Sequence, residues 1–250
     1  MTWQILTGDC IEQMRDLPDD SIDAIVTDPP YGQTSLDWDK ASVAWIEELD
    51  RILKPSGSAW VFGSLKSLVP VVMAFAEMGW NLAQDCIWEK HNGSSFHADR
   101  FRRVHEQVAH FYRGKWGGVY VDVQTFGDDR KRTERRKARP PHMGAIGNGG
   151  TYESEDVGKR LTRSVIHVRS MHGRAIHPTQ KPTGILEPLI RYSTPAGGTV
   201  LDPFAGSGST VLAAKECGRS AIGIERDPEM AIAAQGFIES SASLFGGGVA

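Results

Sequence analysis

Short runs of apolar, often β-branched residues recur along the chain, and most of them end in polar or turn-forming residues. Such runs are typical of strands buried on both faces of a mostly parallel sheet. The pattern therefore predicts strands at residues 3–6, 22–27, 59–62, 82–88, 107–112, 199–201 and 221–224.

Between these runs, apolar residues recur at the spacing of amphipathic helices. In residues 41–53, Val43, Ile46, Leu49 and Leu53 fall on one stripe, and Lys-Pro-Ser-Gly at 54–57 ends the helix. The same reasoning predicts helices at 11–17, 66–78, 183–192, 209–217 and 228–239. Strands that alternate with helices predict an α/β fold, a Rossmann-like, doubly wound and mostly parallel sheet with helices on both faces.

Residues 114–171 interrupt this alternation, since they are rich in Arg, Lys, Gly and Pro and have little aliphatic periodicity. We expect them to form an insertion outside the sheet. Within it, residues 130–139 carry seven basic side chains against one acid, a pattern typical of a solvated loop or of a nucleic-acid contact. These basic side chains are Arg130, Lys131, Arg132, Arg135, Arg136, Lys137 and Arg139.

The glycine-rich residues 241–250 are expected to form a flexible tail.

Composition adds information about the setting of the protein. The net charge of −3 gives no sign of a nucleic-acid binder, so the basic run is a local feature. Cys10, Cys86 and Cys217 lie far apart, without a CxxC pair or a Cys/His cluster at zinc spacing. This favours a reduced, cytoplasmic protein without a metal site. With no signal-peptide pattern and no apolar run near ~20 residues, no membrane association is expected.

The first candidate site is Asp28-Pro29-Pro30-Tyr31, which directly follows the predicted strand at 22–27. Neither proline has an N–H to donate, while the backbone carbonyls of the loop can still accept hydrogen bonds. A Pro-Pro pair by itself is ordinary punctuation after a strand. An acid and an aromatic ring beside it make the loop a candidate for chemistry.

The second candidate site is the turn of residues 202–208, Asp-Pro-Phe-Ala-Gly-Ser-Gly, between a predicted strand and a predicted helix. No Lys follows Gly208, which argues against a P-loop, and Val211 stands where a dinucleotide site prefers a third glycine. About twenty residues further on, Glu225 ends a strand, at the spacing where an acid accepts hydrogen bonds from ribose hydroxyls. The order of these elements favours a nucleoside-like cofactor.

With DPPY at 28–31 and DPFAGSG at 202–208, the chain resembles the β-class DNA amino-methyltransferases, which use S-adenosyl-L-methionine. In that family the catalytic half of the sheet precedes the cofactor half, a circular permutation. The resemblance also covers Gly-Asp-Cys at 8–10 and His-Pro-Thr-Gln-Lys-Pro at 177–182, and it implies that the strand at 3–6 lies beside the strand at 221–224. It implies a catalytic half at 1–113, a target-recognition insertion at 114–171 and a cofactor-binding half at 172–240.

For catalysis, the resemblance implies transfer of a methyl group to the N6 amine of adenine, in a base flipped out of double-stranded DNA. The lone pair of this amine is delocalised into the ring, so acceptors on both N–H groups are needed to favour attack. Asp28 and the carbonyl of Pro29 are the expected acceptors, Pro30 stiffens the loop, and Tyr31 stacks on the base. No covalent nucleophile is required.

For the cofactor, the resemblance implies that Glu225 accepts from the ribose, Asp9 from the adenine amino group, and that Asp202 lies near the methionine amino group. Lys181 is expected near the methionine carboxylate, with a surface ion pair as the alternative. An N-cap role for Asp9 is compatible with cofactor binding, and a packing role is the alternative for Cys10. The predicted cofactor residues are Asp9, Cys10, Lys181, Asp202, Pro203, Phe204, Ala205, Gly206, Gly208 and Glu225.

The alternatives concern the substrate. Beside a methyl-transfer core, the basic residues at 130–139 are expected to contact DNA phosphates. N4-cytosine methylation is the main alternative, and Asp28 favours adenine because family members with Ser there more often modify cytosine. RNA, a protein glutamine amide and a catalytically inactive DNA-binding module are further alternatives. A homodimer and a cognate restriction endonuclease are both compatible with the sequence.

Overall fold

A computed structural model describes residues 1–32, 41–94, 98–127, 132–136, 152–156, 159–170 and 180–245. The chain divides into two compact units, the first made of Met1–Asp122 with Ser164–Ala250 and the second of Val123–Arg163. The second unit is thus narrower than the predicted insertion at 114–171. Within the described ranges, no helix is long and apolar enough to cross a membrane.

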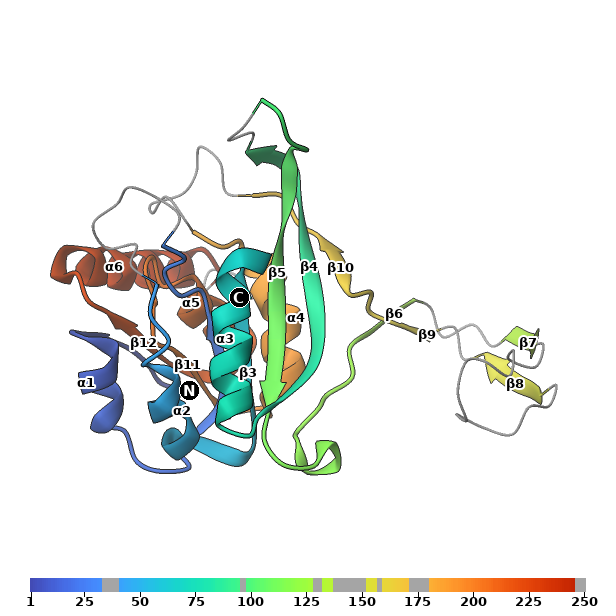
Figure 1. Cartoon of the computed structure of the whole chain (residues 1–250), viewed down its shortest axis with the longest axis horizontal. Coiled ribbons are helices and arrows are strands. Elements are labelled where there is room, and N and C mark those ends of the chain that lie inside the picture. The colour runs from blue at the N-terminus through green and yellow to red at the C-terminus, as the bar shows by residue number, and fades with distance from the viewer. Residues whose placement is uncertain are drawn as a thin grey trace, which may run out of the picture. The chain divides into compact units, whose positions relative to one another are not determined.

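The first unit is built on an eight-stranded sheet with the order β1-β12-β11-β2-β3-β5-β4-β10. Neighbouring strands pair in parallel except at β5, which runs antiparallel to β3 and β4. Figure 1 shows β4 and β5 side by side over most of their length. β1 pairs with β12, which confirms the predicted place of the N-terminal strand. The strands are β1 (Trp3–Thr7), β2 (Ile22–Thr27), β3 (Leu53–Gly63), β4 (Asn81–Ser94), β5 (Arg103–Tyr112), β10 (Val165–His167), β11 (Thr199–Asp202) and β12 (Ser220–Glu225).

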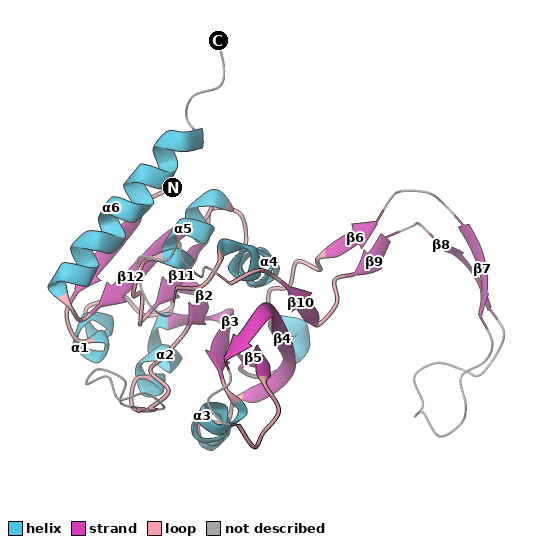
Figure 2. Cartoon of the chain, turned by 90° about the horizontal axis from the view of Figure 1, so that it is seen from above, coloured by secondary structure: helices cyan, strands magenta, loops and turns pink. Residues whose placement is uncertain are grey.

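Helices cover both faces of this sheet, which confirms the doubly wound α/β prediction. Helices α1, α2 and α3 pack on one face and α4, α5 and α6 on the other (Figure 2). Each face has its own hydrophobic core. In the central strand β2, Ile25 lies in the core under α1–α3 and Val26 in the core under α4–α6, so the unbroken apolar run is buried on both faces. The helices are α1 (Cys10–Arg15), α2 (Ile46–Ile52), α3 (Leu65–Glu77), α4 (Thr183–Ser193), α5 (Ser209–Glu216) and α6 (Pro228–Phe245), with a 3-10 turn η1 at Trp116–Gly118.

The predicted helix at 41–53 is shorter in the structure. Helix α2 begins at Ile46, and Leu53 already has an extended backbone, with φ −80° and ψ 130°. Leu53 pairs with Ile22 of β2, and Pro55 disfavours a helical conformation in the residue before it. Residues 53–57 therefore start β3 instead of ending a helix.

The strands at the far side of the sheet extend beyond their apolar runs. The β4–β5 ladder continues to Ser94 opposite Arg103, because antiparallel pairing does not require apolar side chains at an exposed end. The segment of β10 was predicted to lie outside the sheet, which is wrong, since Val165 pairs with Ile87 of β4. Val165 and Ile166 are apolar and β-branched, but the strand is only three residues long, so the run was too short to be read as a strand.

The second unit contains two antiparallel strand pairs. β6 (Thr125–Gly127) pairs with β9 (Lys159–Leu161), and β7 (Arg132–Arg136) pairs with β8 (Tyr152–Asp156). The register sets Arg132 opposite Asp156 and Arg135 opposite Glu153. Among the predicted DNA-contacting residues, Arg130, Lys131, Lys137 and Arg139 lie outside the described residues.

Candidate active site

The two motifs meet at one edge of the sheet, where β1, β12, β11 and β2 have their carboxyl ends. Asp28 follows β2, and Asp202 ends the neighbouring β11, because Leu201 pairs with Ile25. The hydroxyl of Thr27 donates a 2.7 Å hydrogen bond to Oδ1 of Asp202. Open α/β sheets bind their ligands outside this edge, which makes it the candidate site.

The carboxylate of Asp28 is held by two side chains. Oδ1 accepts a hydrogen bond from the hydroxyl of Tyr31, and Oδ2 pairs with Nζ of Lys181, which precedes α4. The Lys181 ammonium also lies 3.3 Å from Oε2 of Glu106 on β5, and Nζ of Lys90 on β4 pairs with Oε1 of Glu106. Two acids and two lysines thus alternate from β4, through β5, to the loop after β2.

Burial and neighbouring charges shift the pKa values in this group. Burial raises the pKa of Asp28, Lys181 acts against the rise, and Glu106 adds to it. Burial opposes the charge on Lys181, but Asp28 and Glu106 outweigh it and raise the Lys181 pKa. Burial opposes ionisation of Glu106 as well, but Lys181 and Lys90 lower its pKa. Burial and Asp28 raise the pKa of Tyr31 well above the usual value, so its hydroxyl remains a donor.

A pocket of about 190 Å³ lies against the loop after β2. Its walls come from this loop, from residues 41–43, from the end of β3 and from α3. Apolar and aromatic walls suit a planar ligand that buries its faces, such as a base. The lining residues include Pro29, Pro30, Tyr31, Phe62, Pro70 and Val71.

The glycine turn after β11 folds back onto the end of β12. The N–H groups of Gly206 and Asp227 donate to Oε2 and Oε1 of Glu225, each at 2.9 Å. The N–H of Ala205 donates to the carbonyl of Ile224 at 2.8 Å. Because a carboxylate has about four lone-pair positions, Glu225 keeps the capacity to accept from two further hydroxyls. The turn and its acid therefore fit a ribose-bearing cofactor.

Gly208 serves a purpose that the sequence did not indicate. It is the N-cap of α5 and has a left-handed φ of 78°. A Cβ at this position would lie 2.9 Å from Cδ1 of Ile238 and 3.3 Å from Cβ of Ala234, both on α6. Contact of Gly208 with the cofactor remains a prediction. The structure shows that α6 packs against Gly208 where a side chain would otherwise lie.

Asp202 anchors the start of the same turn. Its side chain is 3% exposed, and burial raises its pKa to about 6, against hydrogen bonds from Thr210 and Thr27. The N–H of Phe204 donates to Oδ1 at 3.1 Å, and Pro203 is buried beside it. The ring of Phe204 packs edge to face on Trp45, with 5.5 Å between centroids. These contacts fix the turn onto the sheet.

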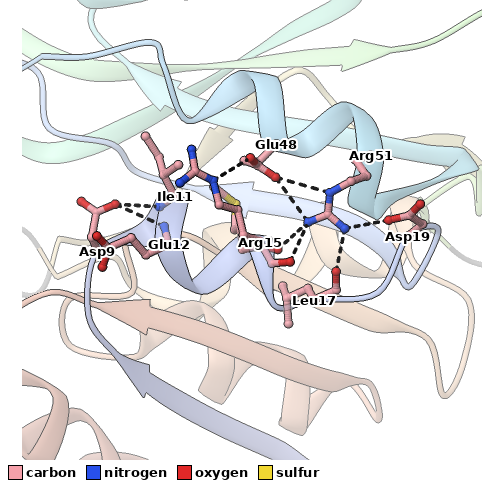
Figure 3. A network of polar contacts seen from close by, with 9 residues as sticks. Asp9, Ile11, Glu12, Arg15, Leu17, Asp19, Glu48 and Arg51 are labelled. Carbon is pink, nitrogen blue, oxygen red and sulfur yellow. Dashed lines mark hydrogen bonds and ion pairs between the residues drawn. The ribbon is translucent and has the colours of Figure 1, made fainter.

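The predicted N-cap role of Asp9 is confirmed, since Oδ1 accepts from the N–H groups of Ile11 and Glu12 at the start of α1. Figure 3 shows this cap and, at the other end of α1, the guanidinium of Arg51. Arg51 donates to the carbonyl of Leu17 at 2.7 Å, so both ends of α1 are fixed by side chains. Burial and the charge of Asp9 raise the pKa of Cys10 to about 11, so its thiol stays neutral and suits a packing role.

Sequence reasoning missed Glu106 and Lys90. The predicted strands at 107–112 and 82–88 stop just short of both residues, because they were drawn around apolar runs. Glu106 is two positions from Val108 and four from His110, both fully buried. In a strand these positions lie on the same face, so the sequence could have shown Glu106 as an acid on the buried face of the strand. In the described part of the chain, no group of three or more His, Cys, Asp or Glu side chains could hold a metal ion.

Comparison with known proteins extends over both halves of the sheet. The sequence model of the N6/N4 family, described as DNA methylase, matches residues 22–235. The chain is 29% identical over 249 residues to the Type II methyltransferase M.HinfI of Haemophilus influenzae, a match that covers 89% of this chain and 64% of that protein. This chain therefore spans less than two thirds of the length of that relative.

Two solved structures show the same architecture. The M1.HpyAVI–SAM complex has 25% identity and a TM-score of 0.67, and the match covers 94% of this chain and 98% of that chain. The cytosine-N4-specific PvuII DNA methyltransferase has 20% identity and a TM-score of 0.67, with 94% and 86% covered. The sheet described above is thus the fold of these methyltransferases.

Proposed function

The chain belongs to the N6/N4 DNA methylase family, and we propose that it transfers a methyl group from S-adenosyl-L-methionine to the N6 amine of adenine in double-stranded DNA. The observation that carries this proposal is the position of Asp28. Its carboxylate follows β2 at the same sheet edge as the glycine turn after β11, and the Thr27–Asp202 hydrogen bond ties the two strand ends together. An acid and a nucleoside-binding turn at one edge are what amine methylation needs.

In this proposal the half of the chain with β11, β12 and β1 holds the cofactor. Glu225 accepts from the ribose hydroxyls, Asp9 from the adenine amino group, and Asp202 lies near the methionine amino group. When bound, S-adenosyl-L-methionine supplies a methyl group on a positively charged sulfonium. The M1.HpyAVI–SAM complex, a structural relative matched over 98% of its own chain, supports this choice of cofactor.

The loop after β2 acts on the target amine. Oδ2 of Asp28 and the carbonyl of Pro29 accept from its two N–H groups, which orients the nitrogen and stabilises the positive charge that develops on attack. Tyr31 and Phe62 line the adjacent pocket, so the base lies against aromatic rings after leaving the duplex. No side chain forms a covalent bond to the base, in keeping with the neutral thiol of Cys10.

Adenine is proposed over cytosine because the motif begins with Asp28 and not with Ser. The fold does not distinguish the two bases, since the PvuII enzyme, which is cytosine-N4-specific, shares it. Cytosine N4 is therefore the second candidate, and the same two acceptors would serve it.

We assign target recognition to the second unit, Val123–Arg163, between the catalytic half at 1–113 and the cofactor-binding half at 172–240. Its basic residues at 130–139 contact phosphates and position the duplex. Three of them, Arg132, Arg135 and Arg136, lie on β7.

The test is a product analysis. The protein is incubated with labelled S-adenosyl-L-methionine and unmethylated DNA of mixed sequence, and the DNA is digested to nucleosides. Label in N6-methyladenine supports the proposal, and label in N4-methylcytosine would replace it with the second candidate. Label that appears only in RNA or protein, or in no product, would refute methylation of DNA, and Asp28→Ala controls for contaminating activity.

A further inference from the structure

Both oxygens of the Asp28 carboxylate are engaged within the chain. Tyr31 donates to Oδ1, and the ammonium of Lys181 pairs with Oδ2. An amine that donates to Oδ2 from the position of the Lys181 ammonium must therefore displace that ammonium.

Lys181 cannot simply move into water when it is displaced. Its side chain is 8% exposed, and the rings of Phe62, Trp88 and Tyr31 lie 5.3 Å, 5.9 Å and 6.0 Å from Nζ. A buried ammonium without an anion is strongly destabilising, so Lys181 needs a second carboxylate. Among the described residues, Glu106 is the other acid in ion-pair contact with Lys181.

One carboxylate oxygen of Glu106 is available to accept a hydrogen bond from Lys181. Its Oε1 is taken by Lys90, whereas its Oε2 is buried and accepts no hydrogen bond from the part of the chain that the structure describes. The Lys181 ammonium lies only 3.3 Å from this oxygen, in ion-pair contact. A small rotation of the lysine would turn this contact into a full hydrogen bond and release Oδ2 of Asp28.

We propose that Glu106 is a positioning residue, which retains the Lys181 ammonium when the target amine takes its place on Asp28. This role rests on the proposed function, since the amine is that of the target base. Lys90 keeps Glu106 ionised and oriented, and Lys181, held by Glu106, stays close enough to neutralise Asp28 before and after the base is bound.

Several charged groups bear on Asp28, and they determine the pH readout. Lys181 and Tyr31 contact it, Glu106 faces it across Lys181, and Asp202 lies at the neighbouring strand end. Arg103 acts on Tyr31, and Lys90 acts on Glu106. Because the charge of Glu106 raises the pKa of Asp28, its removal should lower that pKa.

The test compares Glu106→Gln with Glu89→Gln, using kcat/KM for DNA against pH, cofactor affinity by calorimetry and thermal unfolding. Glu89 lies on the adjacent strand β4, is 50% exposed and pairs with His167. Its substitution therefore removes the same negative charge at a site that does not contact Lys181. For Glu106→Gln we expect kcat/KM to fall roughly tenfold or more, cofactor affinity to stay within about twofold, and the acid limb of the profile to move to lower pH. Glu89→Gln should match the wild type.

Each other outcome has a definite meaning. A Glu106→Gln protein with wild-type kcat/KM and an unmoved acid limb would overturn the proposal, and so would a parallel loss of rate and cofactor affinity. If Glu106→Gln does not fold, Glu106→Asp takes its place, because it keeps the charge but withdraws the carboxylate from Lys181. It should lose rate without moving the acid limb, and full activity would refute the role. A wild-type protein that methylates no DNA would refute the proposed function itself.

Discussion

The hydroxyl of Thr27 donates to Oδ1 of Asp202 at 2.7 Å, although 175 positions separate the two residues in the sequence. This bond joins the loop that carries Asp28 to the turn that carries Gly206. The two motifs therefore share a buried anchor, and the protonation of Asp202 affects the stability of the whole edge.

Asp202→Asn should change the pH dependence of stability. The usual pKa of 3.8 describes Asp202 in the unfolded chain, and burial raises the value to about 6 in the folded one. Between these values the folded state binds more protons, so the contribution of Asp202 to stability falls as pH rises. As pH rises through this window, the free energy of unfolding of Asp202→Asn should therefore increase relative to that of the wild type, by up to about 3 kcal/mol in total. Denaturant titrations between pH 4 and 7 measure this.

Asp99→Asn is the matched control for the loss of one negative charge, since Asp99 is 75% exposed. Asp202→Asn and wild-type stability curves that run parallel over the whole window would contradict the raised pKa of Asp202.

Asp28→Ala should abolish methyl transfer and leave the cofactor bound. The variant removes an acceptor that acts mainly at the transition state, which costs at least ~3 kcal/mol, or more than 100-fold in rate. Lys181 keeps Glu106 as a partner, so the fold should persist. Single-turnover rates and calorimetry measure the two effects, and near-normal turnover would remove Asp28 from the mechanism.

Glu225→Ala should weaken cofactor binding. The N–H groups of Gly206 and Asp227 lose their acceptor, and the proposed ribose contact disappears. We expect affinity to fall by about tenfold or more, in line with about 1–3 kcal/mol for such a loss. Calorimetry with S-adenosyl-L-methionine measures it, with Glu229→Ala in the first turn of α6 as the control. Equal affinities for both variants would show that the turn does not hold the cofactor.

Gly208→Ala should lower the melting temperature more than Gly79→Ala. Both glycines have a left-handed φ, 78° and 79°, so an alanine suffers about the same backbone strain of roughly 1–2 kcal/mol at each. A Cβ at Gly79 meets nothing within 4 Å, whereas one at Gly208 lies 2.9 Å from Ile238. Calorimetric unfolding separates strain from crowding, and equal losses would rule out the packing role. A larger side chain at Gly208 should therefore affect the stability of the fold as well as the cofactor.

Replacement of Arg132, Arg135 and Arg136 by Ala should reduce the salt dependence of DNA binding. Removal of one phosphate-binding side chain lowers the slope of log affinity against log salt by roughly 0.9. Cofactor affinity should not change. Affinities over a salt series measure the slope. Glu153→Gln is the companion variant, because Glu153 faces Arg135 in the β7–β8 register and its removal should strengthen DNA binding. An unchanged slope in the triple variant would show that β7 does not contact DNA and that its basic residues are simply exposed to solvent.

The amino-acid sequence by itself determined the fold class and the two loops at the sheet edge. These follow from local signals, namely unbroken apolar runs such as residues 22–27, helical stripes, and the proline and glycine turns that end strands. The side-chain N-cap at Asp9 and the strand that ends in Glu225 were predictable for the same reason, since a cap and a strand end depend on neighbours a few positions away.

Only the tertiary structure decided what the loops contact. Lys181 meets Asp28 over a separation of 153 residues, and Glu106 joins them because β5 runs antiparallel between β3 and β4 and brings its first half to the active edge. Gly208 faces Ile238 for a similar reason, since α6 packs on α5. Such contacts depend on strand order and direction, which no local period encodes, and on burial, which makes an ion pair necessary only once the surrounding strands and helices exclude water.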